Sequence, residues 1–421
     1  VTHTILERER LDPSATTIAQ VLKRAGYTTG IFGKWHLGDE DAYQPGNRGF
    51  DEVFIHGGGG IGQSYPGSCG DAPGNTYFDP AFLHNGTFEK TKGYCTDVFF
   101  AQAKKWIEGR KDQQQPFLCW LATNVPHGPY NAKPEDKALY AGKVPDDDCA
   151  NFFGMIHNLD LNVGRMMAWL DKKGLAENTL VIMINDNGGT AGVKVFNAGM
   201  RGAKASPWLG GSRGFSFWRL PGKITPADCT ALTAHLDFFR TLAALAGTDL
   251  PPNLQEQTAE GRNLLPLLEN PAAPWPDRHL FTHVGRWPKG SDPEVAKFNN
   301  CSVRNTRYTL VSEAPRGARA AATASPIPRW QLFDVIEDPT QSHNIAADKP
   351  EMVAELGGAY EKWWGSLRGH IDINEKAVGP RLNPFAAKFW KQFGGGPSQE
   401  DYERMDPLKA ATFEQSRARG H

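Results

Sequence analysis

The sequence predicts an α/β fold, with a mainly parallel sheet sandwiched by helices and a smaller C-terminal α+β domain. Over the first 270 residues, short apolar segments such as Phe117–Ala122 and Leu180–Ile184 alternate with longer amphipathic segments. Strands without polar positions are typical of parallel sheets that helices cover on both faces. After Pro271 the pattern changes to strand-like pieces followed by one helix, which is typical of an α+β unit.

Size and composition exclude several classes of protein. The chain has 421 residues, of which 40% are hydrophobic and 22% charged, as in ordinary globular proteins. Lys and Arg number 46 against 47 Asp and Glu, so the net charge of -1 argues against a nucleic-acid binder driven by bulk charge. No apolar run approaches the roughly 20 residues that span a bilayer, so we expect no membrane span.

The predicted elements of the first domain begin with a helix that Ser14 caps and Gly26 ends. Its apolar residues recur at helical spacing. The elements that follow are a strand at Tyr27–Phe32, a Gly-rich loop at Gly57–Gly74, a helix at Val98–Glu108, a strand at Phe117–Ala122, a helix at Asn151–Lys173 and a strand at Leu180–Ile184.

The second domain is predicted from strand-like pieces with turn residues between them. These pieces are His279–His283, Ser302–Val303, Tyr308–Val311 and Gln331–Val335, and a helix at about Pro350–Leu367 follows them. We therefore expect a catalytic domain over residues 1–270, an α+β subdomain over 271–370, and an extension over 371–421 that either wraps the surface or is partly loose.

The six cysteines are scattered and form no CxxC pair, so we predict neither a zinc ribbon nor a thioredoxin-type site. Cys119 lies inside an apolar run and is predicted to be a buried thiol. Cys69 and Cys95 lie in loop-like sequence, and the sequence leaves open whether they pair.

Polar residues follow three strands of the first domain at the points where the strands end. Lys34 and His36 follow the first, His127 the second, and Asp186 and Asn187 the third. In open α/β sheets, ligands bind beyond the carboxyl ends of the strands. Lysine attracts an anion, histidine transfers protons near neutral pH, and Asp and Asn oxygens suit Ca²⁺ or Mg²⁺. Together they predict a site that transfers a tetrahedral oxyanion such as sulfuryl or phosphoryl.

Each of these residues also has a structural explanation. Lys34 is compatible with a surface position, and His36 with packing against Trp35. His127 stands between two prolines and fits a rigid loop, and Asp186-Asn187-Gly188-Gly189 fits a simple turn. It is the coincidence of all of them at one sheet edge that favours a functional site.

The segment Gly33-Lys34-Trp35-His36-Leu37-Gly38 resembles a signature of the sulfatase family, within the alkaline phosphatase-like superfamily. Further segments resemble family motifs in the same order along the chain. They are Gly49-Phe50-Asp51, Pro126-His127-Gly128-Pro129, Asn158–Arg165, Asp186-Asn187-Gly188-Gly189, Arg201-Gly202-Ala203-Lys204 and Leu332-Phe333-Asp334. The resemblance covers residues 1–367 and implies an alkaline phosphatase-like fold and a sulfuric ester hydrolase.

The resemblance also implies a role for each matching residue. Lys34 and Lys204 would bind the sulfate group, His127 would hold the bridging oxygen and act as an acid, His36 would assist turnover of the covalent intermediate, His283 would contact the substrate, and Asp186 and Asn187 would be two ligands of a calcium ion (Ca²⁺).

Two departures from the family pattern stand out. Sulfatases use a Cys or Ser in a Cys/Ser-x-Pro/Ala-x-Arg motif that is converted to formylglycine, and no cysteine here is followed by that pattern. The family places this motif, and a pair of Asp metal ligands, before the first helix. We therefore expect an N-terminal portion to be missing and the chain as written to be inactive. In addition, Leu209 stands where the family usually has Glu, and Gly214-Phe215 replaces Val-Pro.

Two other functions stay open at this point. One is a phosphate or phosphonate ester hydrolase of the same superfamily. Gly33-Lys34-Trp35-His36 and Pro126-His127 disfavour it, because such phosphatases usually bind two zinc ions with more Asp and His ligands. The other is a non-catalytic binding protein that has lost the nucleophile.

For a sulfatase, the implied partners are a sulfated small molecule or carbohydrate and a formylglycine-generating enzyme, with no nucleic acid. The resemblance also implies an extracytoplasmic location, whether periplasmic, secreted or lysosomal.

Overall fold

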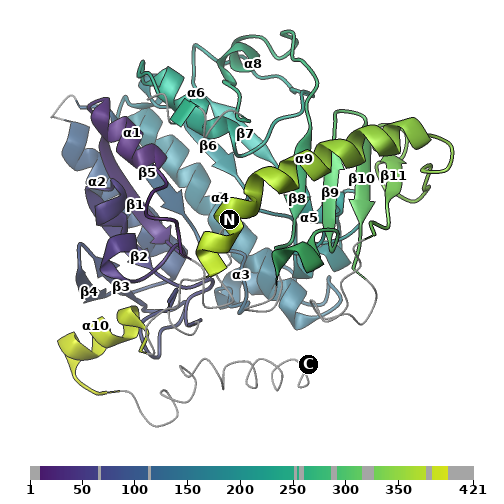
Figure 1. Ribbon diagram of the computed structural model, residues 1–421. Coiled ribbons are helices and arrows are strands. Elements are labelled where there is room, and N and C mark those ends of the chain that lie inside the picture. The colour runs from purple at the N-terminus through teal and green to yellow at the C-terminus, as the bar shows by residue number, and fades with distance from the viewer. Residues whose placement is uncertain are drawn as a thin grey trace.

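The computed structural model describes residues 10–64, 68–111, 115–250, 254–255, 260–285, 292–314, 327–375 and 382–396. A five-stranded sheet of order β4-β3-β2-β1-β5 organises the N-terminal half (Figure 1). Strand β1 pairs in parallel with β2 and β5, whereas β3 and β4 extend one side as an antiparallel hairpin. The bounds are Thr28–Lys34 for β1, Glu52–His56 for β2, Ala81–His84 for β3, Thr87–Lys90 for β4 and Phe117–Ala122 for β5.

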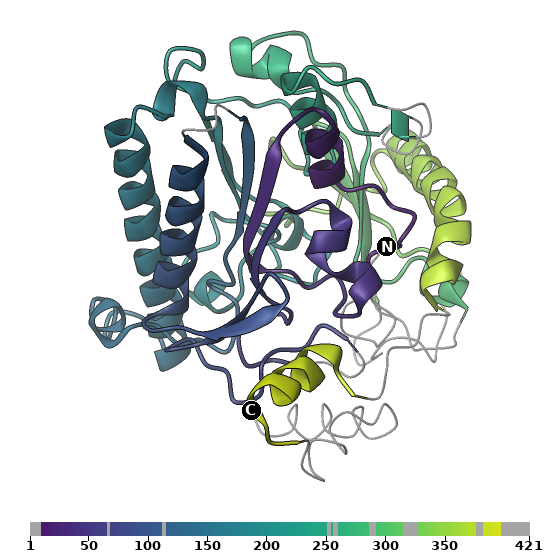
Figure 2. The same cartoon turned by 90° about the vertical axis from the view of Figure 1, so that its left-hand side faces the viewer.

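Helices cover both faces of this sheet, so the predicted α/β class is confirmed (Figure 2). Helices α2 (Cys95–Lys111) and α4 (Asp147–Lys172) lie on one face, and α1 (Ile18–Arg24) lies on the other. Adjacent residues of β1 pack into two separate hydrophobic cores, one on each face of the sheet. Phe32 packs with the aromatic residues of α2, while Ile31 packs in the cluster that contains Ala19 of α1.

The first helix begins later than the sequence predicts. Thr17, not Ser14, is its cap, because Thr17 and Gln20 form a capping box. The Thr17 Oγ1 atom accepts from the Gln20 N–H at 3.2 Å, and Gln20 Oε1 accepts from the Thr17 N–H at 2.9 Å. Ser14 instead bonds to the carboxylate of Asp12.

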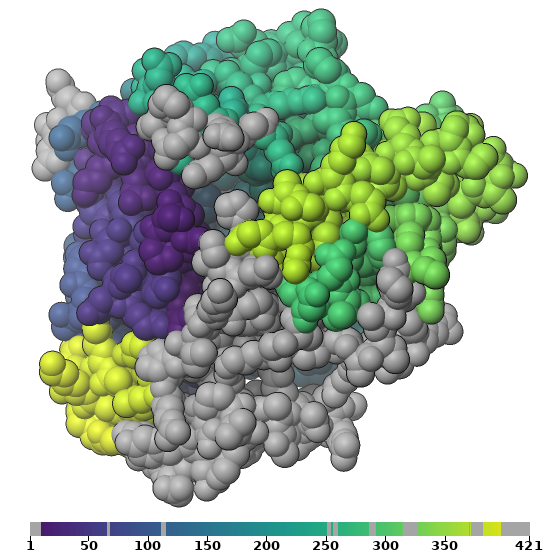
Figure 3. All heavy atoms as spheres, in the orientation of Figure 1, coloured from purple at the N-terminus to yellow at the C-terminus, as the bar shows by residue number. Residues whose placement is uncertain are grey.

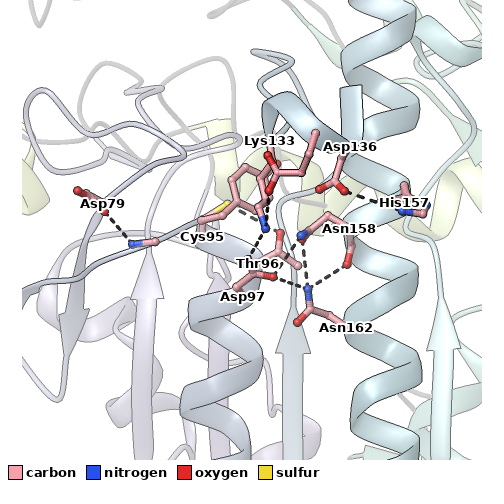
Figure 4. Close-up of polar contacts among 12 residues, drawn as sticks. Asp79, Cys95, Thr96, Asp97, Lys133, Asp136, His157, Asn158 and Asn162 are labelled. Carbon is pink, nitrogen blue, oxygen red and sulfur yellow. Dashed lines mark hydrogen bonds and ion pairs between the residues drawn. The ribbon is translucent and has the colours of Figure 1, made fainter. Parts of the chain in front are cut away.

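A buried polar network joins α2 to α4 (Figure 4). The Asp97 Oδ1 atom accepts from the amide of Asn162 at 2.7 Å and from that of Asn158 at 3.2 Å. The Lys133 ammonium lies 3.5 Å from the other Asp97 oxygen. Since both asparagines are buried in α4, Asp97 provides an acceptor for amides that have little access to water.

Strand β6 (Val181–Ile184) forms a separate two-stranded antiparallel sheet with β7 (Ser216–Arg219). Among the described residues, β5 pairs only with β1 and β6 only with β7. The apolar side chains of β5 are therefore less buried than a central strand would make them, and Trp120 is 40% exposed.

A four-stranded antiparallel sheet of order β11-β10-β9-β8 forms the C-terminal α+β unit, and helix α9 packs across it (Figure 1). Tyr360 and Trp364 of α9 fill its core together with Val303 and Leu310. The domain boundary near residue 270 stays a prediction. The bounds are Leu280–His283 for β8, Cys301–Arg304 for β9, Tyr308–Ser312 for β10, Gln331–Asp334 for β11 and Pro350–Glu375 for α9.

The remaining helices are shorter than α4 and α9. They are α3 (Pro134–Ala138), α5 (Leu209–Ser212), α6 (Asp237–Leu245), α8 (Leu265–Glu269) and α10 (Pro384–Phe393). No helix within the described ranges is long and apolar enough to cross a membrane. All six cysteines carry free thiols, so Cys69 and Cys95 are not paired, and Cys95 begins α2 instead of lying in a loop.

Candidate active site

Lys34 and His36 lie at the carboxyl end of β1. The strand approaches β5 so closely that a Cβ atom on Gly33 would lie 2.2 Å from the Ala122 carbonyl oxygen, and Gly33 also has a φ of 112°. Only glycine fits both conditions. The indole N–H of Trp35 donates to the Gly38 and Tyr43 carbonyls at 3.1 and 3.0 Å, which holds the loop that carries His36.

His127 lies in the loop after β5, between the cis bonds Val125-Pro126 and Gly128-Pro129. Its N–H donates to the Asn124 carbonyl, and its own carbonyl accepts from the Tyr77 hydroxyl, both at 2.8 Å. The Nδ1 atom lies 2.6 Å from the Gly128 carbonyl oxygen. Because a carbonyl can only accept, this contact places the proton on Nδ1 and leaves Nε2 for chemistry.

Lys204 is hydrogen-bonded to the turn after β6 that contains Asp186 and Asn187. The Asn185 side chain donates to the Asn187 carbonyl at 2.6 Å and accepts from the Phe215 N–H at 2.8 Å. The Lys204 N–H then donates to the Gly189 carbonyl at 2.9 Å. The departures from the family pattern at Leu209 and Gly214-Phe215 do not disrupt these hydrogen bonds. Leu209 is buried, and its N–H donates to Gln341 Oε1.

The charges of these segments act on one another. Burial lowers the pKa of Lys34; Asp186 opposes this effect and Lys204 adds to it. Burial lowers the pKa of His127 to about 4; the bond to Gly128 opposes this, and Lys204 and Lys34 add to it. Burial and then Lys34, His127 and Lys204 lower the pKa of His36 to about 3. The structure therefore brings together five of the predicted residues, and Asn187 is next to Asp186 in the same turn.

His56 is part of this cluster, and the sequence reasoning missed it. It is the register partner of Lys34 on β2 and is fully buried. Neither ring nitrogen has a hydrogen-bond partner among the described residues. Burial, and then the charges of Lys34, His36 and His127, hold the pKa of His56 well below its ordinary value. The sequence feature that could have identified His56 is the apolar segment Val53–Ile55, which this histidine directly follows.

His283 does not join the cluster through any described contact. It ends β8 in the C-terminal unit, where its Nδ1 accepts from the Gly285 N–H at 2.7 Å and its Nε2 lies 3.0 Å from the Ala296 carbonyl. Its ring packs against Trp364. These contacts occupy both ring nitrogens within the C-terminal core, so we leave His283 out of the candidate active site.

Asp186 and Asn187 have the oxygen chemistry that calcium prefers, but their number falls short. Ca²⁺ takes about six to eight oxygen ligands. In the part of the chain that the structure describes, no three His, Cys, Asp or Glu side chains are arranged to hold a metal. Asp186 and Asn187 by themselves therefore do not make a complete calcium site, and we derive no catalytic step through the metal.

Lysines and histidines gathered with an Asp–Asn pair beyond the strands of an α/β fold are typical of hydrolases that act on tetrahedral oxyanion esters. The family model for sulfatases matches residues 1–248. The chain therefore belongs to the sulfatase family, as its sequence motifs predict. Its named relatives are sulfatases, which are sulfuric ester hydrolases.

Two relatives illustrate the extent of the similarity. The uncharacterized sulfatase YdeN of Escherichia coli is 24% identical over 411 residues, which cover 86% of this chain and 68% of that protein. Human arylsulfatase A is 28% identical over 378 residues, which cover 81% and 69%.

Solved structures show the same fold. Ps i-CgsB in complex with k-i-k-neocarrahexaose is similar with a TM-score of 0.69 and 25% identity over 86% of this chain and 77% of that chain. The phosphonate monoester hydrolase SpPMH from Silicibacter pomeroyi reaches a TM-score of 0.53 at 18% identity over 86% of this chain and 82% of that chain, which is a similarity of fold alone.

Proposed function

We propose that the candidate active site binds the sulfate group of a sulfate ester between Lys34 and Lys204. The observation that carries this proposal is the convergence of the two lysines, which come from segments far apart in the sequence, on Asp186 and His127. The two ammonium groups repel each other, since the charge of Lys204 lowers the pKa of Lys34, and a tetrahedral anion between them relieves that repulsion.

The two histidines have complementary proton chemistry. His127 keeps its proton on Nδ1, so its Nε2 is free to gain a proton and deliver it to the leaving oxygen as a general acid. A bound sulfate offsets the charges of Lys34 and Lys204, which lower the pKa of His127 without it. The low pKa of His36 keeps it neutral, and in this proposal it accepts a proton during turnover of the covalent intermediate once bound sulfate offsets the charges of Lys34 and Lys204 that lower its pKa.

We further propose that the nucleophile and the other calcium ligands come from outside residues 1–421. The proposal is supported by the two oxygen ligands at Asp186 and Asn187 and by the distribution of the Cys/Ser-x-Pro/Ala-x-Arg motif. The motif follows no cysteine, and its one serine match, Ser312-Glu313-Ala314-Pro315-Arg316, begins in β10 of the C-terminal unit. Strands β5 and β6, whose outer edges pair with no described strand, leave room for a further strand. In this proposal the nucleophile is a formylglycine that a maturation enzyme generates.

The substrate we propose is a sulfated carbohydrate or another sulfated small molecule. The support is family membership and the similarity to Ps i-CgsB, which was solved with a neocarrahexaose. Family membership is also the only support for an extracytoplasmic location. A phosphate or phosphonate ester is the second candidate, because the fold alone is shared with a phosphonate monoester hydrolase.

Calorimetry with inorganic sulfate and inorganic phosphate tests the proposed site on the 421-residue chain. We expect sulfate to bind more tightly than phosphate, and Lys34→Ala and Lys204→Ala to weaken sulfate binding by roughly tenfold or more. Lys92→Ala is the matched control, because the Lys92 side chain is 89% exposed and pairs with Asp79 on the surface. Preferential phosphate binding would favour the second candidate, and unchanged sulfate binding in both site variants would refute the site.

A further inference from the structure

Helix α10, in the predicted C-terminal extension, contacts β4, the edge strand of the main sheet. In the space-filling view the helix, in yellow, lies against the purple N-terminal part of the molecule (Figure 3). The Gln392 side chain accepts from the Phe88 N–H at 2.8 Å and donates to the Phe88 carbonyl at 2.7 Å. Phe385 and Phe389 contact the Phe88 ring with centroid distances of 5.2 and 5.3 Å. The glutamine thus takes the place of a neighbouring strand on β4.

Asn383 has two functions at the start of α10. Its Oδ1 caps the helix by accepting from the N–H groups of Phe385 and Ala386 at 2.9 and 3.1 Å. Its Nδ2 donates to the Asp39 Oδ2 atom at 2.9 Å. Asn383 is fully buried and Asp39 is 3% exposed, so this contact is shielded from water.

Asp39 lies three residues after His36 and joins two loops of the catalytic half. Its Oδ2 also accepts from the Gly70 N–H at 2.6 Å, and its own N–H donates to Ser68 Oγ at 3.0 Å. A Cβ atom on Gly70 would lie within 2.3 Å of the Asn383 side-chain atoms, so only glycine permits this approach. The loop that carries His36, the segment around Gly70 and helix α10 therefore meet at one buried carboxylate.

We propose that Asn383 is a positioning residue, and that its bond to Asp39 couples helix α10 to the loop that holds His36 beside Lys34. The effect on sulfate binding rests on the proposed function, whereas the coupling itself does not. A residue 344 positions further along the chain thus helps to hold the active-site loop in place.

The substitution Asn383→Asp separates this coupling from helix capping. Aspartate caps a helix as well as asparagine does, but it removes the donor that faces Asp39. Burial raises the pKa of Asp39 to about 7; the bonds from Gly70 and Asn383 oppose this, and Glu40 and Asp71 add to it. Glu40 itself is paired with Arg10 at 2.6 Å. Two carboxyl groups in contact cannot both ionise easily, so the variant keeps a shared proton at low pH and loses it at higher pH.

Hydrogen–deuterium exchange of the full chain tests the coupling. At about pH 8, we expect Asn383→Asp to speed exchange in residues 35–40 by roughly tenfold over the original chain, and at about pH 6 by much less. Asn383→Ala should speed exchange there at both pH values. Gln392→Ala is the matched control, because it releases β4 without touching Asp39, and it should speed exchange in residues 87–90 only.

Two results would overturn the proposal. One is an Asn383→Asp variant whose residues 35–40 exchange like the original chain at the higher pH. The other is a Gln392→Ala variant that loosens residues 35–40 as much as Asn383→Ala does, since that would show general destabilisation. Calorimetry with inorganic sulfate tests whether the coupling also affects anion binding at the active site. If the original chain binds no sulfate, the proposed function fails while the exchange data still decide the coupling.

Discussion

The pKa of His127 is set by opposing effects, and a bound anion would change the balance between them. Burial and the two lysines lower its pKa to about 4, and the hydrogen bond to Gly128 opposes them. We predict that saturating inorganic sulfate raises the pKa of His127 toward its ordinary value of about 6.5. An NMR titration of the histidine ring protons measures this shift, and His84, which pairs with Glu52 and Glu89 outside the site, serves as an internal control. Sulfate binding without any change at His127 would contradict its placement beside the anion.

His84 predicts a pH dependence of stability outside the active site. Its ring nitrogens lie 2.7 Å from Glu52 and from Glu89, and only the protonated imidazole donates to both. Burial lowers the pKa of His84, but these two hydrogen bonds outweigh it and raise the pKa above 6.5.

A raised folded-state pKa means that this stabilisation is fully present below about pH 6.5 and is lost as the pH rises through the folded value. We expect His84→Gln to destabilise the chain by about 0.5–1.5 kcal/mol at pH 5.5 and by less at pH 9. Urea unfolding at both pH values measures the difference. An equal loss at the two pH values would show that the charge of His84 has no part in it.

At the level of elements, the α2–α4 contact depends on Asp97 (Figure 4). We predict that Asp97→Ala lowers the free energy of unfolding by about 1–3 kcal/mol, because the buried Asn158 amide loses its carboxylate acceptor and the Asn162 amide keeps only its bonds to Asn158. Thermal or urea unfolding gives the value. Asp160→Ala, at an exposed position of the same helix, should change stability by less than about 0.5 kcal/mol. Similar losses in the two variants would argue against the network.

The elements that the sequence predicted best are the long ones and the continuously apolar ones. Helix α4 and strand β5 are found at or within a few residues of their expected bounds, because amphipathic spacing and an unbroken apolar run are local signals. The hairpin β3–β4 and helix α10 were missed. Their stability comes from partners such as Phe88 and Gln392, which are 304 positions apart in the chain.

For the whole molecule, calcium binding tests whether the ligand set is complete. Two oxygen ligands at Asp186 and Asn187 are too few for a tight site, so we expect calorimetry to detect weak calcium binding or none on the 421-residue chain. Asp186→Ala serves as the control for any heat that is observed. Tight one-to-one binding that depends on Asp186 would show that the remaining ligands lie within these residues.

Measurements of sulfatase activity test whether the active site is complete. We predict no measurable sulfatase activity from residues 1–421, even with a formylglycine-generating enzyme, because covalent catalysis needs its nucleophile. In a longer chain that supplies the Cys/Ser-x-Pro/Ala-x-Arg motif, His127→Ala should cost more with a poor leaving group than with an activated aryl sulfate. Lys34→Ala should cost about the same with both, because it stabilises the sulfuryl group whatever departs. Equal losses for His127→Ala on both substrates would remove its acid role.

The sequence by itself determined the α/β class, the sulfatase family and the residues that gather at the site, because strand-end positions and ordered motifs are local features. Only the tertiary structure decided that His56 lies beside Lys34 on the neighbouring strand, that the contacts of His283 lie in another core, and that Asn383 reaches Asp39. These three depend on which distant segments share a buried volume. Burial and neighbouring charge also set the proton affinities of the two site histidines, and neither is encoded in the residues next to them.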